Sequence, residues 1–163
     1  MQMQGLFIEN FQVLGAISPS ADLFNGDPDS DVFSMKNLEK IVFLVAQKSG
    51  GTNTGTATLR VRSAASAVSS PAGTAITFTH SKKTTGASDT MGTPTKAVAA
   101  NGIVTTANED TIHVIEVDAR DLPEGDSFVY LDATETVNDP VLGAVIALGV
   151  KAKLGYPFPT ALS

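Results

Sequence analysis

The chain contains no cysteine, so disulfides and thiolate metal sites are excluded. It also has no tryptophan and only two tyrosines, which disfavours a lectin or a glycosidase, because sugar sites usually stack on aromatic rings. Charged residues make up 17% of its 163 residues, whereas an average domain has about 25%. A surface with few charges is easier to cover with a partner, since fewer ions must be desolvated.

The charge that is present is mainly acidic, because 17 Asp and Glu residues outnumber 11 Lys and Arg residues and give a net charge of −6. A nucleic-acid binder needs a basic stripe, and the only basic doublet is Lys82-Lys83. The most apolar run, Val141–Val150, has about half the length of a membrane-spanning helix. Residues 1–10 lack the basic leader and apolar core of a signal peptide. We therefore expect a soluble protein made in a cytoplasm, with no nucleic-acid or membrane partner.

Alternation of apolar and polar residues predicts strands along most of the chain, separated by Gly, Pro and Asn turns. No segment keeps an apolar period of 3.6 residues, so the expected fold is all-β. We predict a single domain over residues 1–163, built as a two-sheet β-sandwich of jelly-roll type with about eight strands. The expected strands are 11–17, 38–47, 56–63, 74–80, 111–118, 127–133 and 141–154, with fragments at Val98 and Ile103-Val104.

The run 141–154 is the most apolar of these strands. Its glycines, Gly143 and Gly149, favour a strand, because each would cost roughly 1 kcal/mol in a helix. Its even-numbered residues are all apolar from 142 to 154, so this side is predicted to face the core. Because an unpaired buried carboxylate is costly, Ile146→Asp is expected to collapse the fold. In the first strand Phe11, Val13 and Ile17 are expected to lie on one side, with Gly15 between them.

The two histidines, His80 and His113, both lie inside strand patterns. A serine hydrolase would need one of them beside a nucleophilic serine and a carboxylate, and the sequence has no Gly-x-Ser-x-Gly elbow. A zinc site would need both histidines together with carboxylates. Histidines at the core or its edge are the simpler interpretation, and a hydrolase is the least favoured alternative. No catalytic residue and no cofactor is assigned, and the protein is not expected to be an enzyme.

Residues 22–31 form an acidic, turn-rich loop in which Asp27, Asp29 and Asp31 alternate. Their oxygens are the ligands that calcium prefers, yet the sixth and twelfth positions counted from Asp27 are Val32 and Leu38 instead of the Gly and Glu of an EF-hand. A solvated turn is the first interpretation of this loop, and an irregular calcium site is the alternative.

Both ends of the chain are predicted to lie outside the core. Residues 1–10 are expected to form an arm or a first edge strand, and residues 156–163 an extended apolar tail. Such segments suit strand addition to a neighbour or docking into its groove. A polar insertion at 81–94 is expected to be mobile or ordered by a partner. The residues predicted to serve assembly are Leu6, Phe7, Ile8, Tyr156 and Phe158.

Four short elements follow one another between about residues 38 and 160. They are Thr54–Val61 following Ile41–Val45, then Ala75–Phe78, then Ile115–Ala119 and Asp121-Leu122 before Phe128–Leu131, and lastly Asp139–Val145 leading to Pro159-Thr160. In this order they resemble small virion proteins of tailed bacteriophages, above all capsid decoration (cement) proteins.

The resemblance implies a non-enzymatic protein on the capsid exterior, synthesised in the host cytoplasm. Such a protein binds the major capsid protein and stabilises contacts between its subunits, as a homotrimer. One alternative is a structural component of a phage tail or neck. The other is an extracellular β-sandwich binding module that depends on calcium held by Asp27, Asp29 and Asp31.

Overall fold

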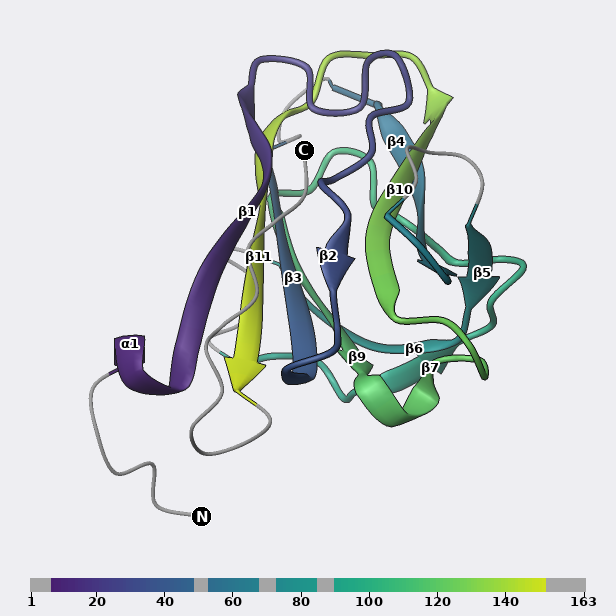
Figure 1. The fold of residues 1–163 in the computed structure, drawn as a ribbon. Coiled ribbons are helices and arrows are strands. Elements are labelled where there is room, and N and C mark those ends of the chain that lie inside the picture. The colour runs from purple at the N-terminus through teal and green to yellow at the C-terminus, as the bar shows by residue number, and fades with distance from the viewer. Residues whose placement is uncertain (1–6, 49–52, 68–72, 85–89, 152–163) are drawn as a thin grey trace.

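The alternating segments fold into strands of two antiparallel sheets that pack as a sandwich (Figure 1). The structure is a computed structural model that describes residues 7–48, 53–67, 73–84 and 90–151. Its strands are β1 (Phe11–Ser20), β2 (Phe33–Ser34), β3 (Leu38–Lys48), β4 (Thr56–Ala64), β5 (Thr74–Ile76), β6 (Phe78–Thr84), β7 (Thr95–Ala97), β8 (Ile103–Val104), β9 (Thr111–Asp118), β10 (Phe128–Val137) and β11 (Leu142–Lys151). A helical turn, α1 (Phe7–Asn10), precedes β1, and a 3-10 turn, η1 (Ala119–Asp121), follows β9.

The first sheet has six strands in the order β1-β11-β3-β9-β6-β7. The second has the order β2-β10-β4-β5, and β8 also pairs with β4. The predicted all-β, two-sheet sandwich is therefore confirmed. The structure has more strands than the predicted eight. The additional ones include the short strands β2, β7 and β8, and the predicted strand 74–80 is divided between the two sheets. Of the two predicted fragments, Ile103-Val104 is β8, whereas Val98 lies just beyond β7 and is exposed.

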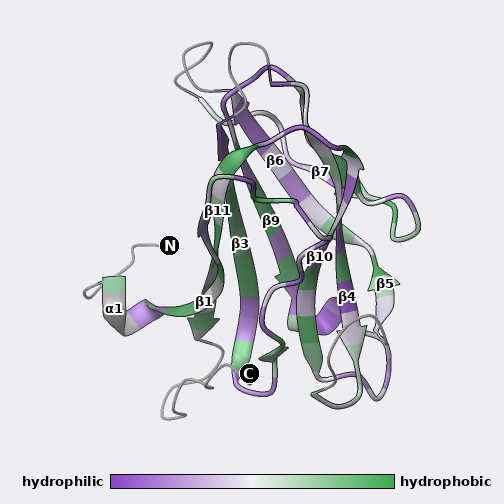
Figure 2. Cartoon of the chain, turned by 90° about the horizontal axis from the view of Figure 1, so that it is seen from above, coloured by the Kyte–Doolittle hydropathy of each residue, from purple (hydrophilic) through white to green (hydrophobic). Residues whose placement is uncertain are grey.

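The core lies between the sheets and is built from alternate residues of the long strands. Ile41, Phe43 and Val45 of β3, which the alternation places on one face, are fully buried. The ring of Phe43 lies 6.1 Å from the ring of Phe33 in β2, which joins the two sheets across the core. Figure 2 shows hydrophobic residues running along β3 and β11. The strand β9 has the bounds predicted for it.

The predicted strand 74–80 is two strands that belong to different sheets. Ile76 pairs with Val61 in the second sheet, whereas Phe78 pairs with Ala97 in the first. Both Ile76 and Phe78 are buried, as predicted, because the chain crosses from one sheet to the other at Thr77 and keeps its apolar side inward. The strand β6 then continues to Thr84, so the first part of the predicted insertion 81–94 is strand, and residues 85–89 lie outside the described residues.

The prediction that Val13 and Ile17 lie on one side of the strand is wrong. Val13 pairs with Leu148 and Gly15 pairs with Ala147, so Leu14 is an extra residue in β1, as in a β-bulge. The bulge reverses the alternation, leaving Val13 62% exposed and burying Leu14. Gly15 adopts a φ of 107°, which favours glycine, and the strand continues beyond the predicted break to Ser20.

The predicted strand at the end of the chain is confirmed as β11, but its predicted orientation is wrong. The odd-numbered residues face the core: Val145 is 3% exposed and Ala147 is fully buried. Ile146, which was expected to be buried, is 45% exposed on the outer side. A Cβ at Gly143 would lie 2.8 Å from Cδ2 of Leu23, and one at Gly149 would lie 2.9 Å from Cδ2 of Leu38, so the glycines on the inner side of β11 leave room for these core side chains. Residues 152–154 lie outside the described part of the chain.

The expected N-terminal arm is helical where the structure describes it. Phe7–Asn10 form the turn α1, and the edge strand of the first sheet is β1. The ring of Phe7 stacks on that of Phe11, with 4.7 Å between the ring centroids. Residues 1–6 and the predicted tail at 156–163 lie outside the described residues.

Gly55, just before β4, lies in close contact with Asp139 and Val141. A Cβ at this buried position would overlap the carbonyl oxygen of Asp139 and lie 2.6 Å from Cγ2 of Val141. We expect Gly55→Ala to lower the free energy of unfolding by about 2 kcal/mol, as overpacked sites do, measured by urea denaturation. The control is Gly125→Ala, which meets open space but has a φ of 92°, and so reports backbone strain alone. An equal or smaller loss for Gly55→Ala would contradict the close contact.

Candidate functional site

The outer side of the six-stranded sheet carries a continuous set of apolar side chains across four neighbouring strands. The pairing places Ile146 beside Leu44 and Leu44 beside Val114, so one apolar row crosses β11, β3 and β9. We call this surface the outer apolar face. Its residues are Val13 of β1, Leu142, Ala144, Ile146 and Leu148 of β11, Val42, Leu44 and Ala46 of β3, and Ile112 and Val114 of β9.

Several side chains of the outer apolar face are open to solvent. Leu142 is 50% exposed and Ile112 is 38% exposed, in addition to the strongly exposed Val13 and Ile146. Single exposed apolar residues are common on protein surfaces, but contiguous apolar patches on one face mark sites of interaction. The surface therefore has the character of an interface.

A shallow groove of about 510 Å³ lies at one end of this face. Its lining combines small apolar residues with larger ones, and Lys48 and Asp110 also contribute to it. A groove of this kind suits an apolar side chain or segment, because its walls offer few polar groups that need hydrogen bonds. The apolar residues that line it are Pro19, Ala46, Ile112, Leu142 and Ala144.

The outer side of the second sheet is different, because it is polar and is covered by its own chain. Arg62 of β4 forms an ion pair with Asp132 of β10, and this hydrogen-bonded carboxylate raises the pKa of Arg62. Arg62 Nη1 also donates to the carbonyl of Gly73 at 3.0 Å, and the amide of Gly73 donates to the hydroxyl of Tyr130 at 3.1 Å. Tyr130 is fully buried. These groups satisfy one another, so this side is closed within the chain.

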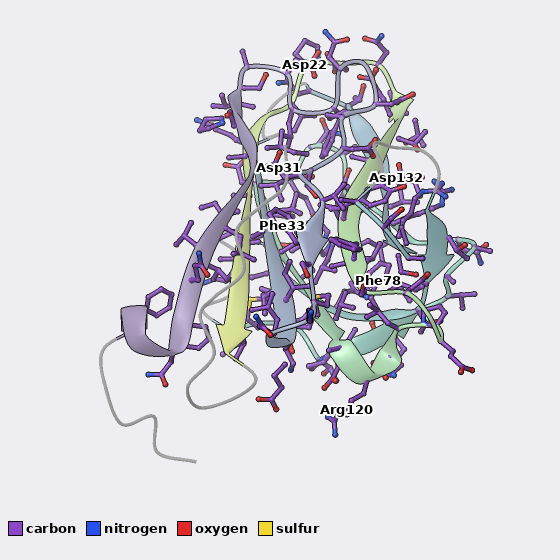
Figure 3. All side chains as sticks on the ribbon, viewed as in Figure 1. Asp22, Asp31, Phe33, Phe78, Arg120 and Asp132 are labelled. Carbon is purple, nitrogen blue, oxygen red and sulfur yellow. The ribbon has the colours of Figure 1, made fainter. Side chains whose placement is uncertain are left out.

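The three calcium candidates contact different parts of the sandwich. Asp27 Oδ1 accepts a hydrogen bond from the amide of Glu135 at 2.7 Å, and Asp29 forms an isolated bridge with Asp132. Asp31 Oδ2 lies close to Gly15 of β1, and Figure 3 shows Asp31 toward β1 and away from Asp132. In the described ranges, no group of three or more His, Asp or Glu side chains is placed to hold a metal ion. Asp27 fastens the acidic loop to β10.

The two histidines lie in the first sheet. His80 Nδ1 lies 3.3 Å from the hydroxyl of Thr95, and burial lowers the pKa of His80. His113 is 2% exposed, with Nε2 3.3 Å from the hydroxyl of Thr111. Burial, together with the nearby positive charge of Lys82, lowers the pKa of His113 to about 4. His113 is therefore a neutral residue of the interior at pH 7, in line with the simpler interpretation of its pattern.

The predicted assembly residues are only partly covered by the structure. Phe7 is 54% exposed, and Ile8 lies in α1. Leu6, Tyr156 and Phe158 lie outside the described residues. The outer apolar face was missed because the even-numbered residues of β11 were assigned to the core. The signal that could have revealed it is Gly143 and Gly149, which share one side and indicate close packing there.

The chain was compared with family models, curated proteins and solved structures, and no match was found. Within the described ranges, no helix combines the length and the apolar character needed to cross a membrane.

Proposed function

We propose that this chain is a structural protein of a phage virion that binds the outer surface of the capsid. It stabilises contacts between subunits of the major capsid protein and associates with itself as a homotrimer. The observation that carries the proposal is the outer apolar face. Apolar surface contributes about 25 cal/mol per Å² when it is removed from water, so a face of this kind favours assembly.

The strand order supports a more specific description of the fold as a jelly roll. The strands β1-β11-β3-β9 of one sheet and β2-β10-β4-β5 of the other follow the order of two interleaved Greek keys with eight strands. The strands β6, β7 and β8 are then an insertion between β5 and β9. Jelly rolls are frequent in viral capsid domains and also occur in lectins. Because a fold does not define a function, the topology supports the virion role only as an analogy.

Electron microscopy of virions tests the proposed location. Particles of a phage that encodes this chain are labelled with an antibody raised against the purified protein, and particles from a phage deleted for the chain serve as the control. We expect gold label on the outside of intact heads. Label confined to the tail or neck would favour the structural alternative, and particles without label would overturn the proposal.

A stability measurement tests the proposed stabilisation of contacts between shell subunits. Heads that lack the chain should release their DNA at a lower temperature than wild-type heads, since contacts between shell subunits are then not braced. Adding the purified protein back should restore the release temperature. Heads that bind the protein without any gain in release temperature would show that it binds the capsid without stabilising it.

A further inference from the structure

On the basis of this structural role, we infer that the outer apolar face is where copies of this protein contact one another. A neighbouring copy covers the face and the groove at its end. The size of the face, its charge and the form of the sheet edges each favour a second copy as the occupant.

The size of the face fits a protein partner. The strands β11 and β3 each have about ten residues, which at ~3.3 Å per residue extend ~33 Å, and four strands spaced ~4.8 Å apart span ~19 Å. The flat projection is then about 600 Å², the same order as the ~800 Å² that each partner buries in a stable complex. Side chains add to this area, so the face alone is large enough for association between copies.

The charge of the face also fits a second copy. The whole chain has a net charge of −6, so two copies repel one another through most of their surface. The face is nearly neutral among its described side chains: the residues in register with it, together with the groove, supply three lysines and three carboxylates. Lys40 Nζ is paired with Glu116 Oε2 at 2.6 Å. The remaining members are Lys48, Lys83, Asp110 and Asp118.

The sheet edges are less suitable for self-association than the face. The edge strand β1 is interrupted by the bulge at Leu14 and contains Pro19, which cannot donate a backbone hydrogen bond. At the opposite edge, β7 has three residues. Short and bulged edges block the addition of further strands, so contact through the face is the favoured route.

Mass measurement by sedimentation velocity tests the inference with the purified full chain and without capsids. We expect the wild-type protein to sediment with the mass of a dimer or a trimer and to dissociate on dilution. Ile146→Asp places a charge in the centre of the face and is expected to weaken association at least about tenfold. The matched control is Val137→Asp, because Val137 is 44% exposed but lies in β10 of the other sheet. This variant should associate like the wild type.

Each variant is first checked for its fold by circular dichroism and thermal melting. If Ile146→Asp does not fold, Leu142→Lys at the groove provides the second test. A wild-type chain that stays monomeric at every concentration, or face variants that associate normally, would overturn the inference. The virion labelling uses the wild-type chain, so its outcome is independent of the sedimentation measurement. If heads are labelled but the purified chain is monomeric, only the inference about self-association is overturned. If the chain is an oligomer but virions carry no label, only the proposed location is overturned.

Discussion

Val145→Asp is expected to unfold the protein, whereas Ile146→Asp, one residue further along β11, leaves it folded. Val145 is 3% exposed and lies between Ile17 of β1 and Val45 of β3. A carboxylate at this position has no cation to pair with in the surrounding apolar cluster, and burying such a charge costs several kcal/mol. Since a domain of this kind is stabilised by about 5–15 kcal/mol in total, most or all of the stability would be lost.

Urea denaturation followed by circular dichroism measures this difference. The wild type and Ile146→Asp should show cooperative transitions, with Ile146→Asp changed by less than about 1 kcal/mol, because surface substitutions usually have small effects. Val145→Asp should show little or no folded baseline. The opposite pattern, a folded Val145→Asp and an unfolded Ile146→Asp, would restore the orientation of β11 that the sequence alone predicted.

Acidification is expected to destabilise the protein through His113 before most carboxylates titrate. The pKa of His113 is about 4 in the folded protein, against 6.5 for the free side chain. Between these two values the unfolded chain binds the proton more readily, so stability that is present above pH 6.5 is lost as the pH falls towards 4. Each pH unit in this window corresponds to about 1.4 kcal/mol, which gives a total loss of about 3 kcal/mol.

The free energy of unfolding at pH 7 and at pH 4.5 measures this loss. His113→Leu should lose most of the difference between the two pH values, because the buried imidazole is then absent. His80→Ala is the control and should keep most of it, since His80 is only half-buried. Asp118 does not contribute in this window, because its hydrogen bonds with Arg120 lower its pKa to about 2. An unchanged pH dependence in His113→Leu would contradict the prediction.

The sequence was sufficient to predict strands where one residue in two is apolar and each strand remains regular. The strand β9 has the predicted bounds, and Ile41, Phe43 and Val45 of β3 share one side, as the alternation indicates. The orientation of β11 could not be predicted in the same way, because both of its sides are apolar. A period of two residues separates the sides, but the packing of Leu38 and Leu14 against Gly149 decides which of them is inside.

Two other differences between prediction and structure arise from features that the alternation of apolar and polar residues does not reveal. An inserted residue at Leu14 exchanges the two sides of β1, so Val13 and Ile17 were wrongly assigned to the same side. The crossing at Thr77 leaves the inward positions of Ile76 and Phe78 unchanged, and the sequence therefore gave no sign that they belong to different sheets. The candidate surface was hidden by the orientation of β11, because its exposed residues Leu142 and Ile146 were assigned to the core.

The position of β11 has a consequence for the synthesis of the protein. This strand is translated after the other ten, yet it lies between β1 and β3, and β1 has no other strand partner in its sheet. While the ribosome is still adding residues before 142, β1 lacks β11, its partner in the described sheet, and β3 has one open edge. Folding of the first sheet is therefore completed only after β11 has left the exit tunnel.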